Sequence, residues 1–203
     1  MLLTRDKLYS YNSYEKFRNS TNESLNKVRN SLSCQDNFDI FLSHSYDDRD
    51  YILNLFLLLE ETYDFNVYVD WIVDKTLNRG NVNTTTAEII RRRMKQSKCL
   101  IYATSENSTN SKWMPWELGY FDGYKGKVAI LPIVNDNQYE YQGQEYLSLY
   151  PYIDKAPSTK SKDEELWINK NNSSILLKKW INSWVLDYHI IHGIAPDFVE
   201  FGH

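Results

Sequence analysis

Cysteine is scarce in this sequence: among its 203 residues there are only two, Cys34 and Cys99. A pair of cysteines provides neither a disulfide framework nor a structural zinc site, so no metal centre is expected. Cys99 lies in the apolar run from Cys99 to Ala103, where it is expected to be a small buried hydrophobic residue.

Long hydrophobic runs are missing as well. The longest apolar stretch extends from Ile52 to Leu59, much shorter than the about 20 residues that a membrane-spanning helix needs. The N-terminal residues from Met1 to Lys7 lack the apolar segment of a signal peptide. These two absences predict a cytoplasmic protein that makes no contact with a membrane.

Clustered positive charge is also lacking. The formal net charge is −4, and the only dense basic run is Arg91–Arg93, which is expected to be a solvated helix face. Duplex nucleic acid requires a distributed basic footprint, so nucleic acid is not expected as a partner. Neither the glycine-rich dinucleotide motif nor the P-loop motif occurs.

What the sequence does contain is a regular alternation of short β-rich runs and helical segments. Its 42% hydrophobic and 25% charged residues are ordinary for a globular protein. Several of the β-rich runs are almost wholly apolar, which is typical of a parallel sheet covered by helices on both faces. The strands are expected at 38–42, 66–69, 99–103, 128–133 and 147–153, and the helices at 49–63, 87–97 and 113–124.

The pattern places this α/β domain at residues 38–155, with an addition on each side. Residues 1–37 are polar, and a short amphipathic helix is expected near 22–33. Residues 156–203 are expected to form a helical addition whose last helix runs from Ser173 to Tyr188. The roles of both additions are left open.

Unusual polar residues gather where the predicted strands end. In a doubly wound sheet, ligands bind beyond the carboxyl ends of the strands. The loops at 43–48, 70–83 and 104–112 all lie at that edge. The four clusters are Ser43–Asp48, Asp70–Trp71 with Asp74, Ser105–Ser108, and Trp113–Tyr120 at the start of a helix.

The order and spacing of these motifs resemble the TIR (Toll/interleukin-1 receptor) domain family. The run from Phe38 to Ser45, then Val67–Asp70, then Ser105–Ser111 leading into Trp113-x-x-x-Glu117, follow one another as in that family. The resemblance covers about residues 38–153. It implies a flavodoxin-like, doubly wound, parallel five-stranded sheet, the TIR fold, with helical additions at both ends.

Some members of this family consume NAD+ with a glutamate in the helix after the third strand, and the resemblance implies that Glu117 is the catalytic residue. Trp113 lies one helical turn before it, on the same face. Nicotinamide in NAD+ is already a cationic leaving group, so a lone carboxylate suffices to stabilise the oxocarbenium-like ribose that develops. NAD+ is then a substrate, and no cofactor is expected. Because Glu117 lies near a helix N-terminus, its negative charge could also simply interact favourably with the helix dipole.

Substrate-binding roles are predicted for seven further residues, several of which have a structural alternative. Asp48 could equally be a helix cap, and Trp113 could pack the core while shaping the pocket floor. Trp71 is expected to stack on a base or dock on a neighbour. His44 is expected to fix its loop by a hydrogen bond rather than act as a base. The predicted set is Phe41, Ser43, Tyr46, Asp48, Asp70, Trp71 and Trp113.

The predicted function is that of a TIR NAD+ nucleosidase, a glycohydrolase or ADP-ribosyl cyclase similar to TIR proteins of Thoeris-like anti-phage systems. The resemblance implies self-association through TIR–TIR contacts and a separate effector protein that responds to the product. The alternative is a non-catalytic TIR interaction module, an adaptor or virulence factor, which has no chemical need for Glu117. A nucleotide hydrolase is a weaker alternative because no phosphate-binding loop is present.

Overall fold

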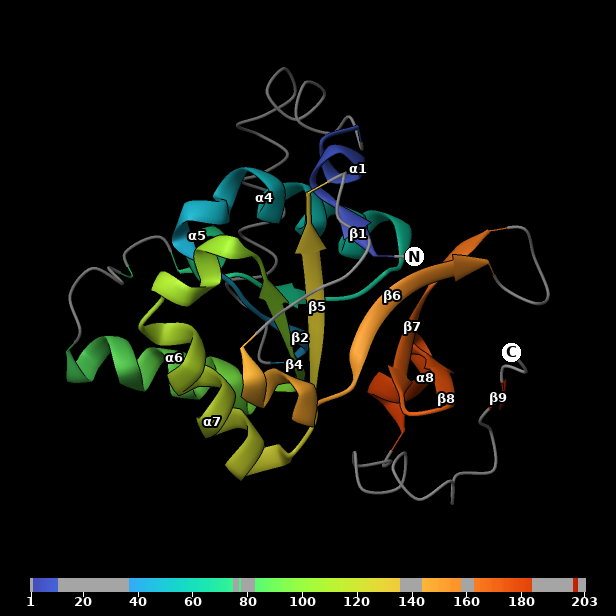
Figure 1. Ribbon diagram of the computed structural model, residues 1–203. Coiled ribbons are helices and arrows are strands. Elements are labelled where there is room, and N and C mark those ends of the chain that lie inside the picture. The colour runs from blue at the N-terminus through green and yellow to red at the C-terminus, as the bar shows by residue number, and fades with distance from the viewer. Residues whose placement is uncertain are drawn as a thin grey trace.

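A computed structural model describes residues 2–10, 37–74, 77, 83–135, 144–157, 163–183 and 199–200. Its centre is a parallel sheet with the strand order β3-β2-β4-β5-β6 (Figure 1). This is the flavodoxin-like order, and the predicted fold class is confirmed. The strands are β2 (Phe38–Ser43), β3 (Val67–Tyr68), β4 (Ser97–Thr104), β5 (Val128–Val134) and β6 (Tyr152–Pro157).

The central strands form because their apolar side chains are buried on both faces. Every residue of β5 is buried, and in β4 only Lys98 is exposed. The parallel register pairs Ile40 with Cys99 and Leu100 with Val128, so the middles of three strands share one core. Cys99 has no exposed surface, as its apolar surroundings predicted.

Three main helices follow the first three strands. They are α4 (Arg49–Leu57), which continues as a π-helical turn η2 (Leu58–Thr62), α6 (Thr84–Gln96) and α7 (Trp113–Lys125). The N-cap of α6 is Asn83, whose side chain accepts from the Thr86 N–H at 2.9 Å, so this helix begins three residues before the predicted start at Ala87. Helices α6 and α7 lie side by side in Figure 1 and both contact β2 and β4.

The fifth strand begins later than predicted. Residues Glu145–Leu149 form a 3₁₀ helix, η4, and β6 starts only at Tyr152. Within this turn Leu147 is the buried apolar residue, whereas Leu149 is 66% exposed. The apolar residues of 147–153 therefore do not share one strand face, and the prediction of a strand over the whole range was wrong.

The C-terminal addition is mostly sheet rather than helix. β7 (Glu164–Lys170) pairs antiparallel with β6, and β8 (Ser173–Leu176) pairs antiparallel with β7. Asn171 adopts a φ of 54°, a left-handed conformation that suits a tight hairpin turn. Helix α8 (Leu177–Asn182) begins only after β8. The short strand β9 (Val199–Glu200) pairs antiparallel with β8. The predicted helix from Ser173 was therefore wrong over its first turn, and residues 184–188 lie outside the described residues.

The N-terminal addition starts with a strand and a helix. β1 (Leu3–Thr4) pairs in parallel with the end of β5, and α1 (Arg5–Ser10) follows it directly. Leu3 and Leu8 are buried, which anchors this segment to the domain. The helix predicted near 22–33 lies outside the described residues. Among the segments that are described, we find no helix long and apolar enough to cross a bilayer.

Candidate active site

The candidate catalytic carboxylate, Glu117, is completely buried in the second turn of α7. The Ser43 hydroxyl at the end of β2 donates to Glu117 Oε2 at 2.6 Å. A hydroxyl–carboxylate bond of this length is charge-assisted, and it fixes the orientation of the carboxyl group. Two residues 74 positions apart, both predicted as site residues, are therefore in direct contact.

His44 is held in one tautomer by two hydrogen bonds. Its Nδ1 lies 2.9 Å from the Leu42 carbonyl oxygen, which can only accept, so Nδ1 must donate. Its Nε2 accepts a hydrogen bond from Trp71 Nε1 at 3.0 Å. The ring is therefore neutral with the proton on Nδ1. Asp70 Oδ1 lies 3.6 Å from the same Nε2. These bonds agree with the expectation that His44 fixes its loop, and they bring Asp70 and Trp71 to the end of β2.

Asp70 and Trp71 do not lie in an irregular loop as predicted. They begin the single helical turn α5 (Asp70–Val73). Asp70 is buried, and Trp71 is half-buried and packs against the core. The Asp74 N–H donates to the Asp70 carbonyl and closes this turn. The first residues after β3 are therefore helical.

Asp48 joins two loops. Its Oδ2 accepts from the Ser105 hydroxyl at 2.5 Å, and its Oδ1 accepts from Asn107 Nδ2 at 2.5 Å and from the Tyr51 hydroxyl. Asp48 occupies the N-cap position of α4, but its side chain makes no capping bond. Burial, followed by the bond to Asp48, raises the pKa of Tyr51 to about 12. Of the two interpretations of Asp48, the cap is wrong; its carboxylate instead ties the loop after β2 to the loop after β4.

The loop after β4 is itself ordered by side chains. It forms a 3₁₀ helix, η3 (Glu106–Asn110), with a reciprocal capping box at its start. The Ser105 N–H donates to Ser108 Oγ at 2.8 Å, and the Asn107 N–H donates to Ser105 Oγ at 3.0 Å. The Met114 N–H donates to Ser111 Oγ at 3.3 Å, so this loop is connected to the first turn of the helix that carries Glu117.

The remaining predicted site residues are dispersed. Phe41 has no exposed surface and stacks on Tyr68 with ring centroids 5.1 Å apart, in the core beneath the site. Trp113 is buried and packs edge-on against Trp116. Tyr46, in contrast, is 55% exposed, and the Arg49 guanidinium covers its ring and donates to its hydroxyl at 2.6 Å.

Asp74 and Arg93 form an ion pair whose role the sequence did not reveal. Arg93 donates to both oxygens of Asp74, at 2.9 and 2.8 Å, and the Tyr68 hydroxyl donates at 2.8 Å. Burial acts to raise the pKa of Asp74, but these hydrogen bonds outweigh it and the pKa is lowered. Arg93 is buried, so the prediction of a solvated face was wrong for it. Its spacing from Ile89 and Ile90 was the available signal, because residues three and four apart share a helix face.

Metal binding has no support in this geometry. In the described ranges, no three His, Cys, Asp or Glu side chains are grouped so that they could hold an ion. What the described residues offer at this edge of the sheet is one buried carboxylate, Glu117, oriented by the Ser43 hydroxyl, and a second carboxylate, Asp48, that fixes hydroxyl and amide groups of the neighbouring loops.

Comparisons with known proteins identify relatives of this α/β domain. Residues 41–139 match the family model described as Thoeris protein ThsB, TIR-like domain. A protein of Bacillus cereus (strain MSX-D12), named probable 3' cyclic ADP-D-ribose synthase ThsB', is 49% identical over 146 residues, which are 71% of this chain and 75% of that protein.

Two further matches are more distant. A protein of Cytobacillus dafuensis, named putative cyclic ADP-D-ribose synthase TIR2, is 30% identical over 92 residues, 45% of this chain but only 24% of its own length. The crystal structure of the TIR domain of the Toll-related receptor TRR-2 from Hydra magnipapillata covers 54% of this chain and 76% of its own, with 18% identity and a TM-score of 0.39.

The parallel sheet order and the match of residues 41–139 to the family model identify a TIR-like α/β domain. Because the ThsB' relative is matched over three quarters of its length at 49% identity, the chain belongs to the Thoeris ThsB family of TIR-like proteins.

Proposed function

We propose that this protein cleaves the nicotinamide–ribose bond of NAD+ and that Glu117 is its catalytic residue. The observation that carries the proposal is the fully buried Glu117, oriented by the Ser43 hydroxyl at the carboxyl edge of the sheet. Its support from the comparisons is that two relatives are named cyclic ADP-D-ribose synthases. The enzyme is an NAD+ nucleosidase of the glycohydrolase or cyclase type.

The chemistry needs little beyond a fixed negative charge. When the bond between the ribose anomeric carbon and the nicotinamide nitrogen breaks, its electron pair goes to the nitrogen and neutralises the pyridinium ring. The ribose becomes oxocarbenium-like, and the Glu117 carboxylate stabilises that positive charge in a site with little water. Ser43 acts on Glu117 rather than on the substrate, because its hydroxyl proton is directed at Oε2.

Access to Glu117 requires a local rearrangement. Its side chain has no exposed surface, so NAD+ reaches it only when neighbouring groups move aside. Closing of these groups around the bound substrate then keeps bulk water away from the oxocarbenium-like ribose. Exclusion of water favours attack by a nucleophile of the substrate itself, the step that closes a cyclic product.

The names of the relatives support a proposal for the product and the partners. We infer that the product is a cyclic ADP-ribose that acts as a signalling nucleotide in anti-phage defence, with a separate effector protein as its receiver. Self-association through TIR–TIR contacts and a cytoplasmic location belong to the same proposal. Linear ADP-ribose forms from the same cation when water reaches it first.

The test is NAD+ turnover by the wild type, by Glu117→Gln and by Glu88→Gln, with the products resolved by mass spectrometry. Glu88 lies exposed on α6 and gives the same chemical change outside the site. We expect Glu117→Gln to reduce turnover at least about a hundredfold, because it removes the charge that stabilises the cation. The Glu88 variant should match the wild type.

Two results would redirect the proposal. Equal turnover by the wild type and Glu117→Gln would keep the enzyme and remove Glu117 as its catalyst. Intact NAD+ with every folded variant, at high protein concentration and in phage-challenged cells, would favour the non-catalytic interaction module.

A further inference from the structure

The N-terminal segment Leu3–Ser10 lies at the same edge of the sheet as the candidate site. β1 pairs with the last two residues of β5, Leu3 with Ile133 and Thr4 with Val134. Helix α1 then contacts α4, and Figure 1 shows it beyond the carboxyl end of β5. Because β5 is parallel to β2 and β4, its end lies on the side where their loops emerge.

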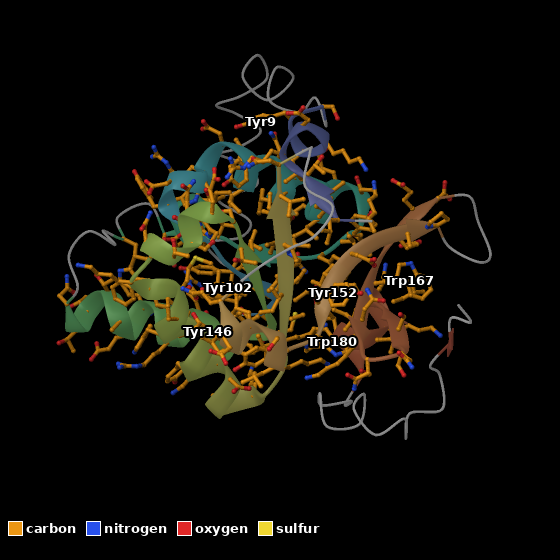
Figure 2. The ribbon with its side chains drawn as sticks, viewed as in Figure 1. Tyr9, Tyr102, Tyr146, Tyr152, Trp167 and Trp180 are labelled. Carbon is orange, nitrogen blue, oxygen red and sulfur yellow. The ribbon has the colours of Figure 1, made fainter. Side chains whose placement is uncertain are left out.

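Arg5 makes the contacts that connect this segment to those loops. Its Nη1 donates to Glu106 Oε1 at 2.8 Å, in the loop after β4. Its Nη2 lies 3.4 Å from the Tyr51 hydroxyl oxygen, and its guanidinium lies 5.1 Å from the centre of the Tyr51 ring. Tyr9, labelled near α1 in Figure 2, packs edge-on against the same ring.

One partner of Arg5, Tyr51, belongs to a hydrogen-bonded network, and the other, Glu106, lies in a loop that this network holds. Tyr51 donates to Asp48, which also accepts from Ser105 and Asn107. Glu106 lies between those last two residues in the chain. Arg5 therefore contacts the network from both sides: through Tyr51 it reaches the loop after β2, and through Glu106 the loop after β4.

The two loops adjoin the proposed catalytic pair. The loop after β2 follows Ser43, the last residue of that strand, and the loop after β4 leads through Ser111 into the first turn of α7. A shift of either loop would therefore displace Ser43 or Glu117 relative to the other. A shift of about 1 Å in a catalytic group can reduce a rate about a hundredfold.

We propose that Arg5 is a positioning residue and that the segment Leu3–Ser10 braces the active-site loops. The inference rests on the proposed function for its catalytic consequence. The salt bridge alone would contribute little, because Glu106 is 61% exposed. The contribution of Arg5 comes from joining that pair to the buried ring of Tyr51, a combination that suits the planar guanidinium and not an ammonium group.

The test compares Arg5→Ala and Arg5→Lys with Lys7→Ala, a change of an exposed cation on the same helix. The measurements are kcat and KM for NAD+, the ratio of cyclic to linear product, and hydrogen exchange at the Asn107 and Ser111 amides. Both amides are hydrogen-bonded within the loop after β4.

We expect Arg5→Ala to lower kcat about tenfold with KM changed less than about twofold, because the machinery is misplaced rather than the substrate lost. A looser site admits water, so the linear product should increase relative to the cyclic one. Exchange at the two amides should be about tenfold faster, a sign of local opening. Arg5→Lys should show the same changes in smaller measure while remaining folded, and Lys7→Ala should match the wild type.

Unchanged kcat, product ratio and amide exchange in Arg5→Ala would overturn the inference. Faster exchange with unchanged kcat and product ratio would also overturn it, because the brace would then have no effect on catalysis. If the wild type consumes no NAD+, the proposed function fails by itself. Amide exchange still tests the brace in that case, and unchanged exchange would remove it too.

Discussion

At the scale of single residues, the carboxyl groups of this protein differ through what surrounds them. The Glu117 carboxylate accepts a hydrogen bond from a hydroxyl. The Asp48 carboxylate accepts from two hydroxyls and an amide, and the Asp74 carboxylate accepts from a guanidinium. Each has donors that compensate for its burial. Glu60 is different: its Oε1 accepts from the Val67 N–H at 2.7 Å, but its charged neighbours are Asp39 and Asp64.

This difference makes Glu60 a source of pH-dependent stability. Burial, and next the repulsion from Asp39 and Asp64, raise its pKa from 4.5 to about 7 despite the Val67 bond. The folded state therefore binds a proton more readily than the unfolded state between pH 4.5 and 7. The free energy of unfolding should consequently fall as the pH rises through this interval.

Glu60→Gln should remove the fall in the free energy of unfolding at high pH. The glutamine can still accept from Val67, but it carries no charge at any pH. We expect the variant to be about 1–2 kcal/mol more stable than the wild type at pH 8 and nearly equal to it at pH 5. Urea unfolding at both pH values measures this, with Glu61→Gln as the exposed neighbouring control. A pH-independent difference would show that Glu60 has an ordinary pKa.

At the scale of elements, α7 has one face buried in the core and another, exposed face that carries two glycines with free space around them. Gly119 and Gly123 lie inside the helix, and a Cβ added at either would meet no atom within 4 Å. Gly126, in contrast, ends the helix with a φ of 65° and donates its N–H to the Phe121 and Asp122 carbonyls. The same residue type therefore serves opposite conformational needs within one helix.

Two glycine substitutions should thus have opposite signs. Gly119→Ala should raise the free energy of unfolding by about 0.5–1 kcal/mol, because alanine favours the helix and there is room for its methyl group. Gly126→Ala should lower it by about 1 kcal/mol, because a Cβ disfavours the left-handed conformation. Thermal and urea unfolding of both variants measure the effects. Destabilisation by Gly119→Ala would mean that its surface is occupied.

The loops were the elements least accessible to sequence reasoning. Their polar composition identified the correct edge of the sheet, but it could not show that Asp48 bonds Ser105 or that Trp71 bonds His44. These partners lie 57 and 27 positions apart in the chain. Turn-forming residues specify where a chain bends, whereas the pairing of two bends depends on strand register.

At the scale of the whole molecule, the C-terminal addition contacts the domain through a buried cation, Lys127, as well as through the pairing of β6 with β7. Lys127, at the start of β5, donates from Nζ to the Ile181 carbonyl at 3.1 Å and to that of Ser183. Its ammonium group lies 5.2 Å from the centre of the Trp180 ring. Figure 2 shows Trp180 and Trp167 within this addition. The end of α8 is thus satisfied by a residue of the parallel sheet.

Replacing Lys127 should loosen the addition before the rest of the fold. We expect Lys127→Ala to cost about 2 kcal/mol, because two carbonyls lose a charged donor and Trp180 loses its partner. Lys112→Ala is the control, since Lys112 is exposed and lies just before α7, outside the addition, so its loss should cost less than about 1 kcal/mol. Hydrogen exchange should become faster across 163–183 first. Uniform acceleration across the sheet would instead show that the addition and domain unfold as one unit.

The sequence by itself determined the alternation of strands and helices, the sheet edge that carries the polar loops, and the candidate carboxylate Glu117. The first two features depend on local periodicity and turn chemistry, which a single chain displays directly, whereas Glu117 was singled out by the resemblance of its motif to TIR domains. Only the tertiary structure decided that residues 173–176 form a strand, that Arg93 is buried, and that Arg5 reaches the loop network. A short mixed segment such as Ser173–Leu176, or a single arginine side chain, suits several environments, and its tertiary partner decides which one it occupies. Such partners are distant in the chain, so their choice is settled by packing and register rather than by the local pattern.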